Sequence, residues 1–260
     1  MARLISLARQ SKILFLRDRY RYMLKKELLI HHPIHNAGFS SEEILAPGGF
    51  GAVLARAGVG KTAFLVQVAL HAMLHDRDVL HVSLHDPVNK IDLWYRELFQ
   101  NMIRQNRLPR ADDLWQEIMP HRFIMTFKID GFTVPKLEER LTDLTVQGIF
   151  QPKMIIMDGL YFDESVREKL AALKGLAERL SMAVWFTVHT HRHDSVTASG
   201  LSSSLDSVSD LFDTLILLQP EGENIPVQMV KGLPEGFPSP RLFLDPSTLL
   251  IGKSDSQERM

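Results

Sequence analysis

The chain has 260 residues, of which 45% are apolar and 23% charged, with a net charge of −1 and no cysteine. This composition predicts a folded domain with a buried core and excludes wholesale disorder, while the net charge excludes a globally basic surface for nucleic acid. The lack of cysteine excludes disulfides, thiolate zinc sites and cysteine nucleophiles, and no apolar stretch reaches the roughly 18 residues of a transmembrane segment.

Basic side chains gather at the start of the chain, where residues 1–26 hold eight against one acid, Asp18. Residues 3–30 lack glycine and proline. Apolar residues there fall near one helical face, namely Leu4, Leu7, Ala8, Leu14, Phe15 and Tyr22. We predict a basic amphipathic helical arm over residues 1–32 and a linker over residues 33–48. The interrupted apolar stretch is not typical of a secretory signal, which favours a cytoplasmic protein.

Several roles are open for this arm. Its apolar face can pack on a neighbouring subunit or another protein partner, with its charges solvated or paired with the acidic remainder of the chain. A basic amphipathic helix can instead bind nucleic acid or an anionic membrane surface. We favour docking on a subunit or partner protein through residues 1–26.

Residues 55–62 read Ala-Arg-Ala-Gly-Val-Gly-Lys-Thr, the pattern of a phosphate-binding loop. An apolar run precedes them and a helix-like run follows, so a strand delivers the loop and a helix N-terminus lies beneath it. Lys61 supplies a cation for the β and γ phosphates, and the Thr62 hydroxyl is placed to ligate Mg²⁺. The alternative is a glycine-rich turn. The predicted phosphate-binding residues are Arg56, Ala57, Gly58, Val59, Gly60, Lys61 and Thr62.

Strand-like and helix-like segments then alternate along the chain. Apolar runs typical of strands occupy residues 50–55, 78–84, 121–127, 153–158 and 183–189. Helical patterns occupy residues 61–75, 89–105, 134–147 and 164–181. Shorter strand-like runs follow at residues 211–219, 225–231, 240–244 and 248–251. This order predicts an α/β core over residues 49–252, with a mainly parallel central sheet flanked by helices, a C-terminal antiparallel extension, and a frayed tail over residues 253–260.

Asp158 is the candidate partner of the phosphate-binding loop. It follows four apolar residues of a predicted central strand, at the point where the strand emerges from the core. A loop of this type requires an acid on a neighbouring strand that holds Mg²⁺ directly or through water. We therefore predict that Thr62 and Asp158 together hold the metal.

The order of these motifs resembles that of the RecA-like P-loop ATPases, in particular the branch of KaiC-, RadA- and DnaB-type helicase domains. Residues 79–86 resemble the second strand of that family, residues 186–192 its sensor strand, and residues 210–218 the strand after its mobile loop. The likeness covers about residues 40–252 and leaves the arm outside. It implies a RecA-like fold that binds ATP and Mg²⁺, and an ATPase that acts as a homo-oligomer with nucleotide between subunits.

The chain departs from this family at the residue that orients the attacking water. A glutamate stands there in the family, whereas His85 and then Asp86 stand here. Asp86 is our candidate for the water-orienting carboxylate. The alternative is that Asp86 caps the helix that begins near Asn89.

The sensor strand departs as well, because His189 stands where the family often has a polar amide. We predict that His189 senses the γ-phosphate and that Arg192 contacts a phosphate or a neighbouring subunit. The alternating His189, His191 and His193 also suggest a metal site, which we do not favour because no cysteine is present and the nearest acid lies on a loop. Lys231 matches the lysine of a helicase Lys-x-Arg finger whose arginine is missing, so hydrolysis is expected to be slow.

Two further groups of side chains receive structural interpretations. His71 and His75 stand one helical turn apart without the acid of a zinc protease motif, and we expect them on the outer face of the helix after the loop. Four large aromatic residues are expected in the core or at an interface, with stacking on adenine as an alternative: Trp94, Tyr95, Trp115 and Trp185.

Three functions remain in view. The first is a slow Mg²⁺-dependent ATPase that acts as an oligomer, and the second is a nucleotide-gated regulator or scaffold with little hydrolysis. The third, a recombinase- or helicase-like motor, is not favoured. Residues 193–210 hold no lysine or arginine, although phosphate contacts to nucleic acid need cations.

Overall fold

The computed structural model describes residues 19–32, 45–108, 111–163, 165–190, 203–222, 224–232 and 242–253. Within these ranges the strands form one sheet in the order β3-β2-β4-β5-β1-β6-β7-β8-β9. The strands are β1 (Phe50–Ala55), β2 (Val79–Ser83), β3 (Arg122–Thr126), β4 (Met154–Asp158), β5 (Ala183–His189), β6 (Thr214–Leu218), β7 (Ile225–Lys231), β8 (Leu242–Leu244) and β9 (Ile251–Lys253).

The sheet has a parallel part and an antiparallel part. The pairs from β3 across to β6 are all parallel. Strands β7, β8 and β9 then add to the β6 edge in antiparallel fashion. The predicted α/β fold, with a mainly parallel sheet and an antiparallel C-terminal extension, is thus confirmed, because buried runs separated by helices pair in parallel, whereas the strands from β6 to β9 follow one another closely in the sequence and pair antiparallel.

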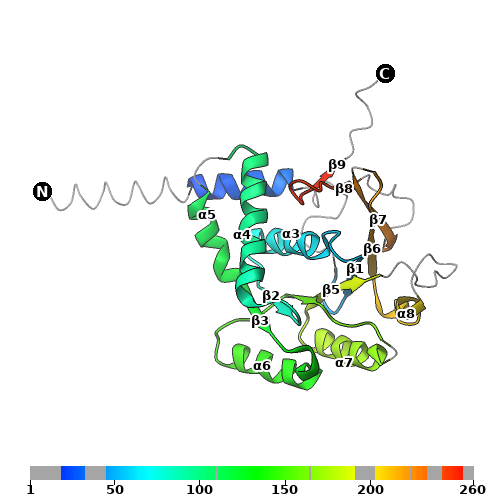
Figure 1. Ribbon diagram of the computed structural model, residues 1–260. Helices are drawn as coiled ribbons and strands as arrows, with labels where there is room; N and C mark the ends of the chain where they lie inside the picture. Colours follow the sequence, from blue (N-terminus) through cyan, green and yellow to red (C-terminus); the bar gives the residue numbers. More distant parts are fainter. Residues whose placement is uncertain are drawn as a thin grey trace, which may run out of the picture.

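Helices cover both faces of the sheet, so the molecule has three layers (Figure 1). One face carries α3 (Lys61–Leu74), α4 (Val88–Gln105) and α5 (Asp112–Ile118), and the other carries α6 (Val134–Val146) and α7 (Val166–Arg179). The short elements are α8 (Ser203–Asp206), η1 (Met119–His121), η2 (Ile129–Gly131) and η3 (Ser209–Leu211). Two apolar clusters separate the sheet from the two helix layers.

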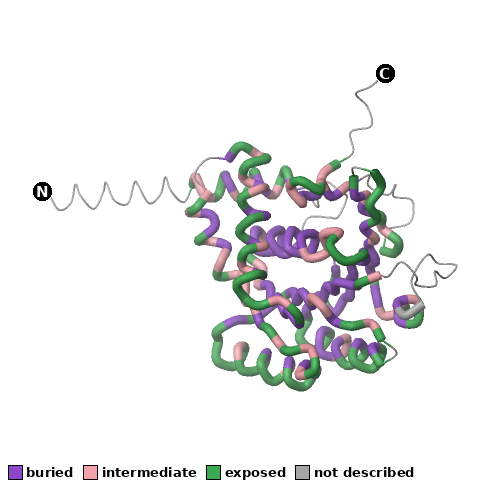
Figure 2. The backbone as a smooth tube through the Cα atoms, viewed as in Figure 1, coloured by how far each residue is buried: buried purple, intermediate pink, exposed green. Residues whose placement is uncertain are grey.

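The helix over residues 19–31 lies on the α3 side of the sheet and covers α3. Leu24 and Leu28 are buried in the same apolar cluster as α3. Lys25 pairs with Asp76 and Glu117, and Arg21 with Glu117, so two basic side chains of this helix bind the chain's own acids. As a result α3 is buried along nearly its whole length (Figure 2).

This packing corrects part of the arm prediction. The side of the helix that is buried is defined by Leu24 and Leu28, whereas Tyr22, which we assigned to the apolar face, is 67% exposed. For residues 19–32 the apolar face packs on the core of its own chain, because α3 offers an apolar outer surface that must be covered. A docking role for residues 1–18 lies outside the described residues.

Other boundaries also differ from those predicted. Helix α5 occupies residues to which we assigned no element, and its first turn carries Asp112 and Asp113, which favour a helix N-terminus. The predicted strand over residues 248–251 is wrong except for its last residue, because β9 begins at Ile251 and includes Lys253, which we placed in the tail. Among the described residues, no helix is long and apolar enough to cross a membrane.

Candidate functional site

The phosphate-binding loop connects β1 to α3 at the carboxyl edge of the parallel strands. Arg56, Ala57 and Gly58 are exposed. Gly60 has a φ of 114°, in the left-handed region, and a Cβ at this position would lie 2.5 Å from Leu244 Cδ2. A side chain at position 60 would therefore be excluded by both backbone conformation and space, which explains the glycine directly before α3.

Lys61 lies at the start of α3 with its side chain folded back on the loop. Its Nζ donates to the carbonyl oxygens of Ala55 at 2.8 Å and Arg56 at 2.9 Å. Burial lowers the Lys61 pKa to about 8, although the nearby Asp158 carboxylate acts in the opposite direction. The ammonium is thus held at the mouth of the loop by acceptors that an incoming anion can replace.

Three polar side chains form a row across the central strands. Ser83 on β2 is directly opposite Asp158 on β4, and Thr187 on β5 follows Phe186, the register partner of Met157. Because side chains alternate between the two faces of a sheet, Ser83, Asp158 and Thr187 point to the face that α3 covers. The register thus brings the carboxylate under the N-terminus of α3.

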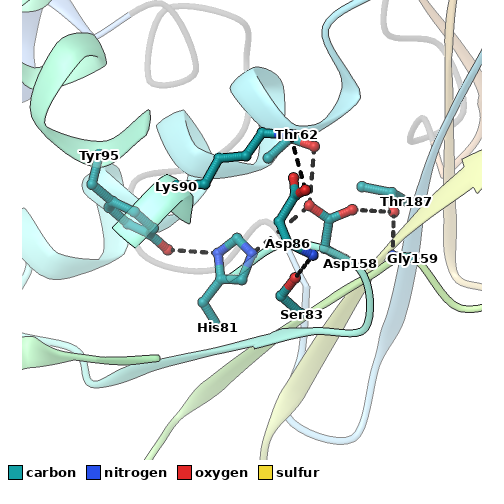
Figure 3. A network of polar contacts seen from close by, with 9 residues as sticks. All are labelled: Thr62, His81, Ser83, Asp86, Lys90, Tyr95, Asp158, Gly159 and Thr187. Atoms are coloured by element: carbon teal, nitrogen blue, oxygen red, sulfur yellow. Dashed lines mark hydrogen bonds and ion pairs between the residues drawn. The ribbon is translucent and has the colours of Figure 1, made fainter. Parts of the chain in front are cut away.

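The carboxylate of Asp158 is fixed by two hydroxyl groups (Figure 3). Thr62 Oγ1 donates to Asp158 Oδ2 at 3.0 Å, and Thr187 Oγ1 donates to Asp158 Oδ1 at 2.7 Å. The Thr187 hydroxyl in turn accepts from the Gly159 backbone N–H at 3.0 Å. Because the Thr62 proton is directed to Asp158, the lone pairs of its oxygen remain free to face a cation.

Asp158 keeps its charge despite its position in the interior. Burial alone would raise the Asp158 pKa, but the opposing effects of His81, Thr187 and Thr62 together lower it below its ordinary value. His81 Nε2 lies 3.9 Å from Asp158 Oδ2, too far for a hydrogen bond, so its effect is electrostatic. An ionised carboxylate beside a hydroxyl is the hard oxygen donor set that suits Mg²⁺, so the residues present fit this ion.

Gly159 shapes the turn that follows Asp158. Its φ is 91°, and a Cβ there would lie 2.4 Å from Cδ2 of the His85 ring. His85 also contacts the Tyr161 ring, with centroids 5.4 Å apart. The glycine therefore allows the segment that follows β2 to pack against the turn that follows β4, beside the carboxylate.

Asp86 belongs to the same group of polar contacts in Figure 3, but its carboxylate is engaged. Lys90 Nζ donates to Asp86 Oδ1 at 2.9 Å, and the Asp86 backbone N–H donates to Ser83 Oγ at 2.9 Å. The alternative that Asp86 caps α4 is wrong, because the N-cap residue is Pro87 and no side chain caps this helix.

The other predicted site residues belong to the end of β5 and the residues after it. His189 ends β5, is exposed, and lies opposite Ala55, the last residue of β1. It is therefore at the edge where the loop begins. Arg192, His191 and His193 lie outside the described residues.

The sequence did not predict a role in the site for two buried polar residues. Thr187 and His81 sit in strands that we treated as apolar, and they are 4% and 0% exposed. The signal that was available is a polar side chain in the middle of an otherwise apolar run, since a buried polar group needs a specific partner.

The paired histidines are not on a solvent-exposed face: His71 in α3 is buried, and His75, the C-cap residue that follows α3, is half-buried. His71 is 4% exposed, its ring contacts His32 from the N-terminal helix, and the His71 and His75 ring centroids are 4.7 Å apart. The helix over residues 19–31 covers this side of α3, which the sequence did not reveal. Among the described residues there is no group of three or more His, Cys, Asp or Glu side chains placed to hold a metal ion. Of the four aromatic residues, Tyr95, Trp115 and Trp185 are buried in the core, which excludes them from stacking on adenine.

Comparison with known proteins bears on this geometry. The sequence model of a family described as AAA domain matches residues 30–195, more than half of the chain. The chain belongs to the AAA domain family. This match includes the loop, α3, β2, β4 and β5, and so covers Thr62, Asp158 and Thr187. No curated protein matches the chain.

Membership of the AAA domain family supports the coarser part of our predictions. The family is of the P-loop ATPase type, which binds nucleotide, usually with Mg²⁺. This AAA domain has the mostly parallel sheet flanked by helices that such a family requires.

Proposed function

We propose that this AAA domain is a RecA-like protein that binds ATP with Mg²⁺ and hydrolyses it slowly as a homo-oligomer. The observation that carries the proposal is the contact between the Thr62 hydroxyl and the Asp158 carboxylate at the mouth of a phosphate-binding loop. The RecA-like assignment is supported by β5, which lies between β1 and β4 and ends at His189 beside the loop.

Phosphate binding would be carried by the loop and Lys61. The loop of residues 56–60, of which Arg56, Ala57 and Gly58 are exposed, and the N-terminus of α3 offer N–H donors to the phosphate oxygens. Lys61 Nζ would exchange the carbonyl oxygens of Ala55 and Arg56 for phosphate oxygens, which are anionic and therefore stronger acceptors. Arg192 is proposed as an additional phosphate contact from its position in the sequence.

Mg²⁺ would be held by the Thr62 hydroxyl and the Asp158 carboxylate, directly or through water. When bound, the ion neutralises charge on the β and γ phosphates. Thr187 would keep Asp158 in one orientation, because it donates to the oxygen that Thr62 does not contact. His189 would be the group that senses the γ-phosphate.

Slow turnover is supported by the state of Asp86, the proposed water-orienting carboxylate. The Lys90 ammonium donates to Asp86 Oδ1 and its positive charge weakens the carboxylate as an acceptor for the proton of a water, which would bind at Oδ2. The same contact favours a second candidate, a nucleotide-gated regulator or scaffold that binds ATP and scarcely hydrolyses it. The nucleic-acid motor receives no support from the described part of the chain.

The homo-oligomer rests on the resemblance to helicase-type proteins, in which a lysine at the place of Lys231 belongs to a finger from the adjacent subunit. This residue is at the end of β7, opposite Leu215 near the start of β6, and its Nζ donates to the Ser209 carbonyl at 2.9 Å. Because β6 is parallel to β1, Lys231 lies toward the sheet edge away from the loop. A phosphate contact from Lys231 therefore requires a second copy of the chain.

Phosphate release and calorimetry with MgATP separate the candidates. Binding with turnover that Asp86→Ala abolishes supports the ATPase, whereas tight binding without turnover supports the regulator. The absence of MgATP binding by the folded protein would overturn both. Light scattering with and without MgATP tests the homo-oligomer, and a protein that stays monomeric in both conditions would contradict it.

A further inference from the structure

His81 is a buried titratable residue beside Asp158. It occupies the middle of β2, is 0% exposed, and faces the same side of the sheet as Asp158, because it is two residues before Ser83. A central strand would be filled more favourably by an apolar residue, since burial of a polar ring costs free energy unless its nitrogens are satisfied. The contacts of the two ring nitrogens of His81 therefore indicate its role.

Tyr95 satisfies the first nitrogen. The Tyr95 hydroxyl on α4 lies 3.2 Å from His81 Nδ1, and both side chains are fully buried. Burial raises the pKa of the Tyr95 phenol, so the hydroxyl keeps its proton at every working pH. Arg122 lies over the Tyr95 ring, with its Cζ 4.6 Å from the centroid, and is itself bound by Asp92. The Tyr95 side chain is thus held by Arg122 over its ring and by His81 at its hydroxyl.

The second nitrogen faces the carboxylate. His81 Nε2 is 3.9 Å from Asp158 Oδ2, and among the described residues it has no hydrogen-bond partner. If the neutral ring carried its proton on Nδ1, the Nε2 lone pair would face an anion, and the Tyr95 proton would lose its acceptor. With the proton on Nε2, Tyr95 donates to Nδ1 and a positive N–H end points at Asp158. Both contacts therefore favour the same tautomer.

We propose that His81 is a positioning residue for Asp158: Tyr95 holds its ring as the Nε2–H tautomer, and this N–H orients the carboxylate that receives Mg²⁺. The proposal rests on the proposed function, because the carboxylate is oriented for a metal only if nucleotide and Mg²⁺ bind there. Thr187 and His81 act on different oxygens of the Asp158 carboxylate, since Thr187 contacts Oδ1 and His81 faces Oδ2. Groups that orient a ligating side chain typically change metal affinity by ten- to a hundredfold when removed.

Two substitutions at position 81 separate the two nitrogens. The side-chain amide of His81→Gln can reach the place of Nε2–H and donate toward Asp158, whereas that of His81→Asn reaches only the place of Nδ1. Calorimetry gives the affinity for ATP in EDTA and in Mg²⁺, and the ratio of the two measures the gain from the metal. We expect His81→Asn to reduce this ratio about tenfold with the EDTA affinity unchanged, and His81→Gln to keep it within about threefold.

A readout without nucleotide tests the contact by itself. In ¹⁵N-histidine-labelled wild-type protein, the His81 signals, assigned by their loss in His81→Gln, should report the Nε2–H tautomer. They should shift in Asp158→Asn. An Nδ1–H tautomer, or His81 chemical shifts that are the same in wild type and Asp158→Asn, would overturn the proposal. So would a His81→Asn protein with the wild-type ratio.

Failure of the His81 proposal can be distinguished from failure of the proposed function. If wild-type protein binds no ATP, the proposed function fails, while the tautomer and its response to Asp158→Asn still decide whether His81 faces the carboxylate. If His81→Asn does not fold, the wild-type spectrum and the Tyr95→Phe variant decide instead. Tyr95→Phe removes the donor to Nδ1 and should change the Nδ1 shift; an unchanged Nδ1 shift would contradict the arrangement.

Discussion

The hydroxyl of Thr62 donates to the carboxylate of Asp158 across 3.0 Å, although 96 positions separate the two residues in the sequence. This contact joins the first turn of α3 to the end of β4, and it exists because β4, β5 and β1 are adjacent and parallel. A hydroxyl and an ionised carboxylate then converge beside a loop of backbone donors. The proposed MgATP site depends on this convergence.

The first prediction concerns the charge of Asp158. Asp158→Asn keeps the size of the side chain and removes its charge, so the gain in ATP affinity from Mg²⁺ should fall by about tenfold or more. Affinity in EDTA should change little, because phosphate contacts do not need the carboxylate. Calorimetry in both conditions measures this. Asp143→Asn, an exposed carboxylate on α6, is the control and should behave as wild type.

The second prediction concerns Gly159, where a side chain would meet the His85 ring. Gly148 also has a positive φ, of 66°, but a Cβ there has nothing within 4 Å. Gly148→Ala should therefore lose only the roughly 1–2 kcal/mol of a left-handed residue, and Gly159→Ala should lose more of the free energy of unfolding. Urea denaturation measures both. Equal losses would show that the His85 contact has no energetic weight.

The third prediction concerns Asp86 and Lys90. Because the ammonium engages the proposed water-orienting carboxylate, Lys90→Ala should raise the rate of phosphate release, whereas Asp86→Ala should lower it at least about tenfold. MgATP affinity should stay within about threefold of wild type in both. Steady-state phosphate release at saturating MgATP provides the comparison. If Asp86→Ala turns over as fast as wild type, Asp86 has no role in hydrolysis.

The fourth prediction is a pH dependence at Asp92. Burial alone would raise the Asp92 pKa, but Arg96 and Arg122 lower it below its ordinary value. The folded protein thus keeps this carboxylate ionised at a pH where the unfolded chain is already protonated. Its contribution to stability is present above about pH 4 and is lost as the pH falls through the folded pKa.

Asp92→Asn should consequently lower the free energy of unfolding at pH 7 by about 1 kcal/mol, because the Arg122 side chain is only 5% exposed and loses its anion, whereas Asp92 itself is 28% exposed and partly screened by solvent. At pH 3 the difference from wild type should be smaller. Chemical denaturation of the two proteins at both pH values tests this. A difference that is the same at pH 7 and pH 3 would argue against the ion pair as its source.

The fifth prediction tests the cover that the N-terminal helix forms over α3. Leu28 is 0% exposed and Ile30 is 49% exposed. Leu28→Ala should lower the free energy of unfolding by about 2–5 kcal/mol, whereas Ile30→Ala should change it by about 0.5 kcal/mol or less. Thermal or urea denaturation distinguishes them. If Leu28→Ala unfolds like wild type, the helix is not part of the cooperative core.

The elements that the sequence predicted well are those whose apolar residues repeat regularly. The runs over residues 50–55 and 153–158 are continuous, apolar and almost wholly buried, so their bounds match β1 and nearly match β4. Helix α5 was missed because seven residues do not establish a helical period. The cover over α3 was missed because an amphipathic pattern shows that a face is buried but not which surface covers it.

The residues of the site likewise fall into those that a local sequence pattern predicts and those that it does not. The loop residues and Asp158 carry a local pattern, so they were predicted from neighbours in the sequence. Thr187 and His81 have meaning only through the register of β5 and β2 with β4, which places them around the carboxylate. Register depends on pairing between residues that are tens of positions apart, so it is not evident from the local pattern of either strand.

The central claim is that the loop before α3 binds the phosphates of ATP through Lys61. Calorimetric titration of MgATP into wild-type protein and into Lys61→Ala, with circular dichroism to show that both are folded, tests it most directly. We predict saturable binding at one site per chain in the wild type and no detectable binding in the variant. Binding of equal affinity in the two proteins, or none in the wild type, would contradict the account.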